Sequence, residues 1–320
     1  METVALRPIF LAGPTAAGKS AIAMEAALRL GGEIISVDSM QVYCGMDIGT
    51  AKPSAEERAQ VRHHLIDVAE LDQGFDAAQF IKLASEATKD IQARGRIPIF
   101  CGGTGFYFKA YLEGLGEAPP SDPRIRAQLV ATPLESLLTE LQQSDPVAYA
   151  SIDKENPRRV IRALEVVRLT GRPFFEQRSQ WRTAHNEADG RLIGVTRPAG
   201  ELVERIHKRV DDMFRNGLVE ETKSLMERGL ERNPTALQAL GYRQVVEHLR
   251  GQRGLAETIE LVKIRTRQFA KRQLTWFRRQ MRLEWITLNG EGGANVESLF
   301  ACNETNTAAH NPNADQNKSQ

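Results

Sequence analysis

A short glycine-containing stretch near the N-terminus has the residue types and spacing needed to hold a phosphate. The sequence GPTAAGKS follows the apolar run RPIF and matches the pattern G-x-x-x-x-G-K-[ST], with Gly13, Gly18, Lys19 and Ser20 at the required positions. Glycines allow a tight turn that brings backbone N–H groups against an anion, and the following helix adds the positive end of its dipole. Lys19 supplies a positive charge, and the Ser20 hydroxyl can bind Mg²⁺. Because loops of this type usually bind ATP or GTP, a nucleotide-dependent enzyme is the first interpretation.

Two further groups are expected beside this loop. Asp38 ends the apolar stretch EIISV, and a GGTG turn at residues 102–105 follows RIPIFC. Ligands of open α/β sheets bind outside the carboxyl ends of the strands, so both groups should lie near Ser20. Asp38 could cap the next turn, hold Mg²⁺ or take a proton from a nucleophile, and its spacing does not choose among these roles. The second carboxylate typical of phosphoryl-transferring P-loop enzymes is not obvious, with Asp67 as the candidate.

The elements that must position these groups alternate between strand and helix in the first third of the chain. Hydrophobic periodicity predicts helices at 20–30 and 76–94 and strands at 7–13, 33–38, 63–68 and 96–103. After a helical, turn-rich stretch, a strand at 191–197, long helices over 201–282 and a strand at 284–288 follow. This order predicts an α/β fold with a P-loop-type parallel sheet core and helices on both faces.

The chain divides into three expected regions. Residues 1–118 and 191–290 form the α/β core with its C-terminal helices, and residues 119–190, which show no convincing strand, form a helical insertion domain. Residues 291–320 are polar and low in complexity, so we expect a disordered tail.

Composition limits the protein class. The chain has 320 residues, of which 41% are hydrophobic, enough for a sizeable core. No apolar run reaches the ~18 residues of a membrane span, and Arg7 and Pro8 lie where a signal peptide would need apolar residues, so a cytoplasmic protein without membrane association is expected. Cys44, Cys101 and Cys302 are odd in number and far apart, which favours reduced thiols.

Charge is unevenly divided along the chain. Residues 158–282 hold 27 of the 42 Lys and Arg residues but only 15 of the 41 Asp and Glu residues. Within them, Lys263 to Arg282 carries eight basic and no acidic residues, interleaved with Phe269, Trp276 and Phe277. Basic charge with aromatic rings is typical of nucleic-acid contact. The alternative is a solvated helix whose aromatic residues face the core.

Seven stretches carry a family resemblance. They are, in order, GPTAAGKS, DSMQVYCGMDIGTAKPS, HHLIDV, GGTGFYFKAYLEGL, NPRRVIRALEV, ALGYRQ and TRQFAKRQLTWFRR. Together they resemble the tRNA dimethylallyltransferase (tRNA isopentenyltransferase) family in its bacterial form, over about residues 8–279. The loop differs slightly, with Ala17 and Ser20 where Ser and Thr are common. Eukaryotic members carry a C-terminal Cys2His2 finger, whereas this tail has only Cys302 and His310, so no zinc is expected.

The resemblance implies a different ligand for the phosphate loop. In this family the loop holds the diphosphate of dimethylallyl diphosphate, the co-substrate, and no nucleotide is hydrolysed. The implied reaction transfers the dimethylallyl group to N6 of the adenosine 3′ of the anticodon and releases diphosphate, with Mg²⁺ as cofactor. The implied partner is a tRNA anticodon stem-loop, whose target base must leave the stack. A monomer is expected.

The resemblance also assigns roles to individual residues. Asp38 is the expected general base, Arg209 is expected to stabilise the leaving diphosphate, and Ser20 is the expected Mg²⁺ ligand together with the diphosphate. The diphosphate-binding residues are Gly13, Pro14, Thr15, Ala16, Ala17, Gly18, Lys19 and Ser20. The tRNA-binding residues are Asp38, Ser39, Met40, Gln41, Thr104, Arg126, Arg158, Arg159, Val160, Ile161, Arg162, Gln238, Ala239, Leu240, Gly241, Tyr242, Arg243, Lys271, Arg272, Gln273, Leu274, Thr275, Trp276, Phe277 and Arg278.

Simpler interpretations remain open at this point. Arg162 and Arg209 could be ion-paired helix residues, and adjacent His63 and His64 point to different faces of a strand, which makes them a poor metal site. The phosphate loop by itself favours a small-molecule or nucleoside kinase. A nucleic-acid-binding regulator with a degenerate nucleotide site is the third hypothesis.

Overall fold

The computed structural model describes residues 7–116, 118–177 and 190–290. The chain forms two compact units, one made of residues 1–105 with 189–320 and the other of residues 106–188. The predictions for Cys302, His310 and the C-terminal tail fall outside the described residues.

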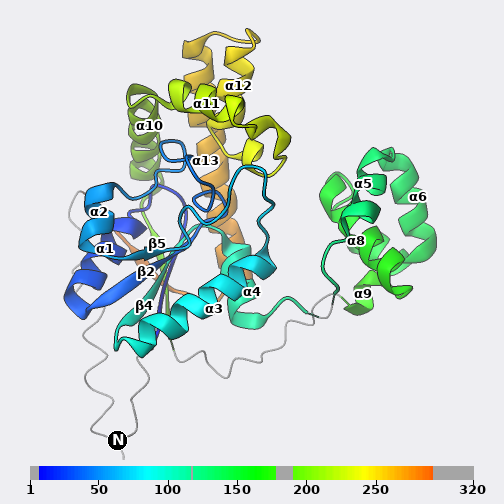
Figure 1. Ribbon diagram of the computed structural model, residues 1–320, viewed down its shortest axis with the longest axis horizontal. Helices are drawn as coiled ribbons and strands as arrows, with labels where there is room; N and C mark the ends of the chain where they lie inside the picture. The colour runs from blue at the N-terminus through cyan, green and yellow to red at the C-terminus, as the bar shows by residue number, and fades with distance from the viewer. Residues whose placement is uncertain (1–6, 117, 178–189, 291–320) are drawn as a thin grey trace, which may run out of the picture. The chain divides into compact units, whose positions relative to one another are not determined.

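A parallel sheet forms the centre of the first unit (Figure 1). Its strands lie in the order β3-β2-β4-β1-β5-β6, and every neighbouring pair is parallel. The bounds are β1 Ile9–Ala12, β2 Gly32–Val37, β3 His63–His64, β4 Ile97–Gly102, β5 Arg191–Thr196 and β6 Glu284–Thr287. The α/β fold class predicted from the sequence is confirmed.

The third strand is shorter than predicted. Leu65 and Asp67 both have positive φ angles, 61° and 55°, so the chain turns immediately after His64. Residues 65–68 therefore leave the sheet, although their apolar pattern predicts a strand over 63–68. Left-handed backbone at Leu65 is uncommon, and no residue type in HHLIDV signals it.

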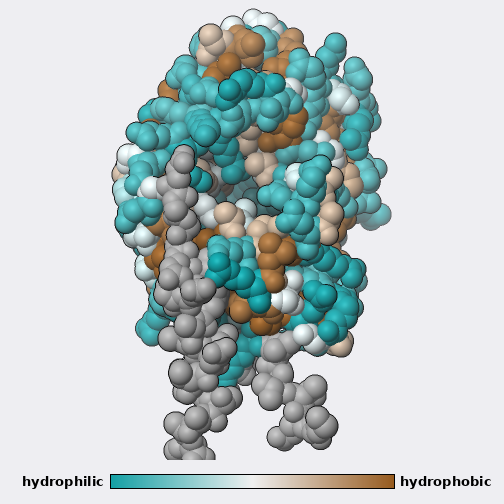
Figure 2. Space-filling view, turned by 90° about the vertical axis from the view of Figure 1, so that its left-hand side faces the viewer, coloured by the Kyte–Doolittle hydropathy of each residue, from teal (hydrophilic) through white to brown (hydrophobic). Residues whose placement is uncertain are grey.

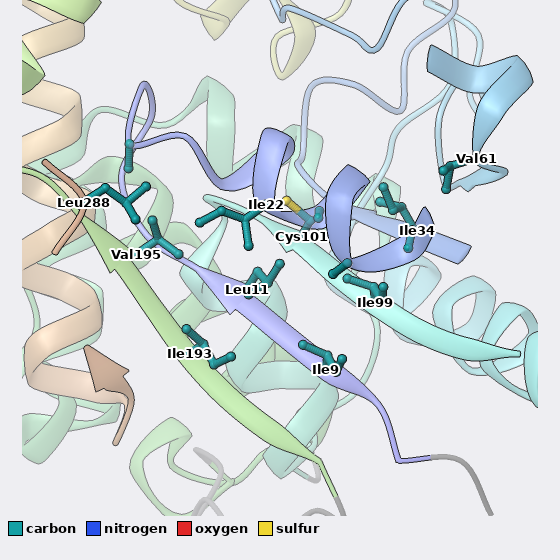
Figure 3. Packing of buried hydrophobic residues seen from close by; sticks show 14 residues of the cluster. Ile9, Leu11, Ile22, Ile34, Val61, Ile99, Cys101, Ile193, Val195 and Leu288 are labelled. Atoms are coloured by element: carbon teal, nitrogen blue, oxygen red, sulfur yellow. The ribbon is translucent and has the colours of Figure 1, made fainter. Parts of the chain in front are cut away.

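The central strands are apolar because helices cover both faces of the sheet. β1 goes to β2 in one direction along the sheet and β3 goes to β4 in the other, so right-handed connections place α1 and α3 on opposite faces. On the α1 face, Ile9 and Leu11 pack with Ile22 and neighbouring residues (Figure 3). Phe10 alternates with them and stacks on Phe100 at a ring-centroid distance of 4.7 Å. The two-residue alternation of β1 thus builds two cores.

The helices of this unit agree with the predicted order, except that α2 was not predicted. They are α1 Lys19–Leu30, α2 Ala55–Gln60, α3 Ala77–Ala93, α10 Ala199–Arg215, α11 Leu218–Glu227, α12 Tyr242–Leu249 and α13 Leu255–Gln280, with 3₁₀ turns at Leu230–Arg232 and Ala236–Gln238. Asp76 begins α3 by accepting a hydrogen bond from the Gln79 backbone N–H, 2.9 Å, and Gly31 ends α1 at φ 66°. These local signals explain why the helix ends were predictable from the sequence.

The second unit consists of helices in its described part. Their bounds are α4 Gly105–Glu113, α5 Pro123–Ala131, α6 Leu134–Ser144, α7 Pro146–Ser151, α8 Pro157–Thr170 and α9 Phe174–Gln177. Leu129, Leu137, Leu141 and Leu164 belong to its apolar core, and none is more than 1% exposed. Within the described residues of the whole chain, no helix has the length and apolar character needed to cross a membrane.

Candidate active site

The phosphate loop runs from the carboxyl end of β1 into the first turn of α1. Gly13 and Gly18 have φ angles of 150° and 101°, a region that favours glycine. A Cβ on Gly13 would lie 2.2 Å from the Val195 carbonyl oxygen, so β5 also requires a glycine there. The loop therefore has the turn and the close backbone approach that its spacing predicts.

Lys19 lies at the base of this loop and is 8% exposed. Its Nζ donates a 2.7 Å hydrogen bond to the Pro14 carbonyl oxygen. Burial lowers the Lys19 pKa to about 8; the Arg209 charge lowers it further, and the Asp38 carboxylate opposes the shift. Burial raises the pKa of neighbouring Cys101 to about 11, so this free thiol stays protonated at neutral pH.

Three arginines, one directly after β5 and two on α10, converge on the loop. Arg197 Nε and Arg205 Nε each donate a 3.0 Å hydrogen bond, to the carbonyl oxygens of Ala17 and Ala16 respectively. The Arg209 pKa is lowered by burial, against an opposing interaction with the Asp38 charge. The resemblance picks out Arg209, whereas Arg197 and Arg205 were missed because their partners are about 180 residues away in sequence.

Asp38 follows β2 and has the capping contacts that the structural interpretation predicts. Its Oδ1 accepts hydrogen bonds from the backbone N–H groups of Met40, 2.8 Å, and Gln41, 3.3 Å. Thr104 of the GGTG turn lies beside it, since its Oγ1 accepts a 3.1 Å bond from the Ser39 N–H. The phosphate loop, Asp38 and the GGTG turn therefore lie near one another, as their places at the ends of the strands predict.

Gln273 connects the phosphate loop to the GGTG turn. Its Oε1 accepts a 2.9 Å hydrogen bond from the Thr15 N–H, and its Nε2 donates a 2.9 Å bond to the Gly103 carbonyl oxygen. Trp276, one turn later on α13, packs so closely that a Cβ on Gly105 would lie 2.2 Å from its ring. The basic helix α13 therefore holds both loops of the crevice through residues that the resemblance assigns to tRNA.

A carboxylate and a tyrosine anchor the loop after Asp38. Glu221 accepts backbone hydrogen bonds from Asp47, Ile48 and Gly49 at distances between 2.9 and 3.4 Å. Tyr242 is fully buried, donates to Glu221 at 2.6 Å and accepts from the Gly49 N–H at 3.1 Å. Burial, followed by the Glu221 charge, raises the Tyr242 pKa. The sequence indicates a contact role for Tyr242, but its side chain supports the loop from inside.

Gln41 supports the same loop from the sheet side. Its Oε1 accepts a 2.8 Å bond from the Ser36 hydroxyl, and its Nε2 donates to the carbonyl oxygens of Thr50 and Ala51, both at 3.2 Å. The Gln41 side chain is thus occupied by hydrogen bonds within the protein, although the resemblance assigns all of residues 38–41 to tRNA contact.

A cavity of about 600 Å³ opens beside the phosphate loop. Its cationic residues are Lys52, Arg58, Arg205, Lys208 and Arg209, its acidic residues are Asp47 and Asp212, and Ala16 links it to the phosphate loop. Figure 2 shows a hydrophilic face that is hollowed near its middle. The balance of charge favours an anionic ligand.

Asp67 does not supply a free second carboxylate. It pairs with the Lys52 ammonium group and with Arg58 NH1, the latter at 2.9 Å, and these cations hold the Asp67 pKa below its usual value despite opposing desolvation.

His64 Nε2 lies 2.7 Å from a Glu33 oxygen, and His63 Nδ1 lies 2.8 Å from the Val61 carbonyl oxygen. Both histidines thus have protein partners, and the described residues contain no group of three or more metal-ligating side chains.

The remaining residues assigned to tRNA fall into exposed and buried sets. On α13, Lys271, Arg272, Thr275 and Arg278 are exposed, Leu274 and Trp276 are half-buried, and Gln273 and Phe277 are buried. Around the start of α12, Gln238 and Arg243 are exposed, Leu240 is half-buried, and Ala239, Gly241 and Tyr242 are buried. In the helical unit, Val160 and Ile161 belong to the core, while Arg158 and Arg159 are exposed and Arg126 and Arg162 are half-buried.

The fold and the loop after β1 define an α/β protein with a P-loop at the carboxyl edge of its parallel sheet. The sequence model of the family described as IPP transferase matches residues 41–280. A tRNA dimethylallyltransferase from Geobacter metallireducens is 45% identical over 293 residues, covering 89% of this chain and 94% of that protein. Another, from Geobacillus thermodenitrificans, is 45% identical over 300 residues, covering 91% and 94%.

Solved structures agree with the sequence comparisons. The crystal structure of a tRNA isopentenylpyrophosphate transferase from Bacillus halodurans is 40% identical, with a TM-score of 0.64, and covers 88% of this chain and 89% of that chain. A eukaryotic dimethylallyltransferase acting on tRNA is 27% identical, with a TM-score of 0.72 and coverage of 88% and 74%. The chain belongs to the IPP transferase family and is a prenyltransferase. The family resemblance carried by the sequence motifs is confirmed.

Proposed function

We propose that this chain transfers the dimethylallyl group of dimethylallyl diphosphate to N6 of the adenosine 3′ of the anticodon in tRNA, releasing diphosphate. The observation that carries the proposal is the meeting of Lys19, Arg209 and Asp38 at the phosphate loop, in a member of the IPP transferase family. A buried lysine and a half-buried arginine suit a leaving diphosphate, and a carboxylate suits a nucleophile that must lose a proton.

The donor half of the site works by stabilising negative charge. As the allylic carbon–oxygen bond breaks, the diphosphate gains charge, which Lys19, Arg209 and the loop N–H groups are placed to stabilise. Removal of one such contact costs roughly 3 to 4 kcal/mol of transition-state stabilisation. Pro14 has no N–H, and the N–H groups of Thr15 and Ala17 already donate to Gln273 and to the Pro14 carbonyl oxygen. The donors we assign are therefore the remaining backbone N–H groups of the loop, and Gly13 and Gly18 give the loop its required curvature.

The acceptor half needs a base. The adenine amine is a weak nucleophile because its lone pair is delocalised into the ring, so a carboxylate that removes its proton assists attack. Asp38 Oδ1 accepts the two backbone hydrogen bonds of the cap, and among the described residues no hydrogen bond is made to Oδ2. Asp38 can therefore cap its turn with one oxygen and serve as the base with the other.

Mg²⁺ fits this site as an ion held largely by the substrate. It is commonly bound by phosphate oxygens, several waters and only one or two protein oxygens, so no cluster of protein ligands is required. The Ser20 hydroxyl, exposed at the start of α1, is the protein ligand we assign. Bound Mg²⁺ would neutralise charge on the leaving diphosphate.

We assign the anticodon stem-loop as the part of tRNA that this chain binds. The exposed cations of α13 and the arginines of the helical insertion at 119–190 supply positive charge for phosphate contacts. Thr104 lies at the crevice through its bond with Ser39, where it can meet an extruded base.

Incubation of the protein with tRNA, Mg²⁺ and labelled dimethylallyl diphosphate tests the proposal. Label should appear in tRNA, and nuclease digestion should place it on the single adenosine 3′ of the anticodon. In the parallel reaction, γ-labelled ATP should transfer nothing to tRNA or to nucleosides. Phosphoryl transfer without prenyl transfer would establish the kinase alternative, and tRNA binding without either would establish the regulator alternative.

A further inference from the structure

Glu165 is a fully buried carboxylate in the helical unit, with 0% of its surface exposed. It lies on α8 and faces the loop that leads into α5. Its Oε1 accepts hydrogen bonds from the Ser121 hydroxyl and from the Asp122 backbone N–H, the latter at 3.1 Å. Its Oε2 accepts hydrogen bonds from Arg126 NH1 at 3.2 Å and Arg162 NH1 at 3.0 Å.

The two oxygens of Glu165 therefore do different work. Oε1 fixes the loop before α5, whereas Oε2 fixes two guanidinium groups that come from different helices. Arg162 is held further by a 2.6 Å bond from NH2 to the Pro119 carbonyl oxygen. Arg126 NH1 donates hydrogen bonds to the Ser121 hydroxyl and to Glu165, both at 3.2 Å. Both guanidinium groups are thus held in one orientation.

Exposure differs sharply between the carboxylate and its partners. The side chains of Arg126 and Arg162 are 41% and 31% exposed, while that of Glu165 is 0% exposed. Two positive charges thus reach the surface over one buried negative charge. Arg158, one turn before Arg162 on α8, lies close enough to Arg126 for their like charges to interact. The surface over this carboxylate is therefore positive and suited to a phosphate.

We propose that Glu165 is a positioning residue that holds Arg126 and Arg162 as a preformed pair for a phosphate of the RNA substrate. This inference rests on the proposed function, since it names how the helical unit presents its charge to tRNA. An arginine on a flexible stem loses rotamer entropy when it binds, and a carboxylate that fixes it in advance removes part of that cost. A mainly structural Glu165 would instead act only through Oε1 and the start of α5.

The substitution Glu165→Gln separates these two roles. Glutamine is nearly isosteric and keeps an acceptor for Ser121 and the Asp122 N–H, but its amide nitrogen replaces Oε2 and cannot accept from the arginines. We expect the KM for tRNA to rise about tenfold or more, since hydrogen bonds involving charged groups contribute roughly 1.5–3 kcal/mol. The KM for dimethylallyl diphosphate should stay at the parental value. The salt slope of tRNA affinity should fall by about one unit per lost phosphate contact.

A double-mutant cycle with Arg126→Ala tests the coupling directly. If Glu165 positions Arg126, this substitution should raise the KM for tRNA about tenfold in the parent and much less in Glu165→Gln. Glu140→Gln is the matched control. Glu140 makes a bidentate pair, at 2.8 and 2.7 Å, with Arg168, which lies on α8 like Glu165. The substitution disrupts that pair and leaves the contacts of Arg126 and Arg162 intact. It should leave the KM for tRNA unchanged.

Two results would overturn the proposal. One is an unchanged KM for tRNA in Glu165→Gln, and the other is a full, additive cost of Arg126→Ala in the Glu165→Gln background. If Glu165→Gln unfolds the helical unit, Arg126→Lys and Arg162→Lys test the arginine pair instead. Each keeps the positive charge but loses the planar guanidinium group that Glu165 orients, and each should raise the KM for tRNA. Failure of the proposed function would appear earlier and differently, as absent prenyl transfer by the parent chain.

Discussion

The carboxylate of Asp38 has two oxygens, and the backbone of its own turn uses one of them. Asparagine can replace that acceptor but cannot take a proton. We therefore expect Asp38→Asn to melt near the parental temperature, to bind tRNA and dimethylallyl diphosphate nearly as well, and to lose on the order of 10² or more in single-turnover transfer rate.

Asp76→Asn is the control for capping, because Asp76 caps α3 in the same manner and contributes nothing to the crevice. It should transfer at the parental rate. A role for Asp38 as a Mg²⁺ ligand would show instead as a rate that recovers at high Mg²⁺. Near-parental transfer by Asp38→Asn at ordinary Mg²⁺ would leave only the capping role.

Lys19 gives the free protein a pH dependence in its donor site. Burial lowers its pKa to about 8, so the ammonium group that binds diphosphate is lost as the pH rises through this value. We expect the KM for dimethylallyl diphosphate to be lowest below about pH 8 and to rise above it. Initial rates at varied donor concentration would measure it.

The lowered Lys19 pKa also makes the stability of the free protein depend on pH. Rising pH weakens donor binding but increases this stability. An unfolded lysine keeps its proton to about pH 10.4, so the unfolded state binds more protons than the folded state above pH 8, and the free chain gains stability with rising pH in that window. Lys19→Arg retains its charge throughout and should show a KM for the donor that does not vary with pH over this window. A parental KM that is flat across pH 8 would show that the Lys19 pKa is not lowered in solution.

At the scale of the element, α11 and α12 hold the loop of residues 47–49 through Glu221 and Tyr242. Tyr242→Phe keeps the packing of the ring but removes its hydroxyl, which donates to Glu221 and accepts from the Gly49 N–H. The variant loses the hydrogen bond to the charged Glu221 and leaves the part-buried Gly49 N–H with only its 3.4 Å bond to Glu221, so we expect a loss of about 1.5–3 kcal/mol in unfolding free energy. Chemical denaturation would measure it, with Tyr149→Phe in the helical unit as the control.

A functional consequence is expected as well, because Asp47 and Ile48 line the cavity beside the phosphate loop. A looser loop should raise the KM for dimethylallyl diphosphate while the KM for tRNA stays near its parental value. Equal effects on both substrates, or no effect on stability, would contradict a supporting role for Tyr242.

The long helix α13 presents cations of two kinds. Lys271 and Arg272 are exposed, whereas Lys263 donates to Asp211 and Glu260, both at 2.8 Å. Replacing Lys271 and Arg272 by Ala should reduce the slope of log K for tRNA against log[salt] by roughly one unit per lost phosphate contact. Lys263→Ala should leave the slope unchanged. An unchanged slope in the variant that lacks Lys271 and Arg272 would show that the basic segment is a structural helix without phosphate contacts.

Most of the elements were predictable, because their signals are local; the early end of β3 and the helix α2 were not. The caps at Asp76 and Gly31, the apolar runs of the strands and the glycines of the loop all lie within a few residues of the structure they determine. The bridge from Gln273 to Thr15 was not predictable, since it spans 258 positions along the chain. Glu221 is separated from Asp47 by 174 positions and gave no signal of its own. The site was therefore predicted through motifs, and the residues that support it were found only in the structure.

At the scale of the whole molecule, the donor site and the proposed arginine pair for tRNA lie in different compact units. The phosphate loop, Asp38 and Arg209 belong to the unit of residues 1–105 and 189–320, and the Glu165 cluster belongs to the unit of residues 106–188. The donor site is therefore complete within one unit. It follows that the donor should act on the stability of that unit alone, whereas tRNA should act on both.

Because the donor site lies within one unit, ligand-induced stabilisation of that unit can identify the donor. A ligand that binds only the folded state stabilises it by about 2.7 kcal/mol at 100 times its Kd. Dimethylallyl diphosphate with Mg²⁺ should therefore raise the melting temperature of the core unit more than ATP at equal concentration, and should leave amide hydrogen exchange in α5, α6 and α8 unchanged. Lys19→Ala should remove the shift, because the diphosphate loses its buried cation. A larger shift with ATP, accompanied by turnover, would contradict the prenyl donor and establish a kinase, since both ligands would compete for the same phosphate loop.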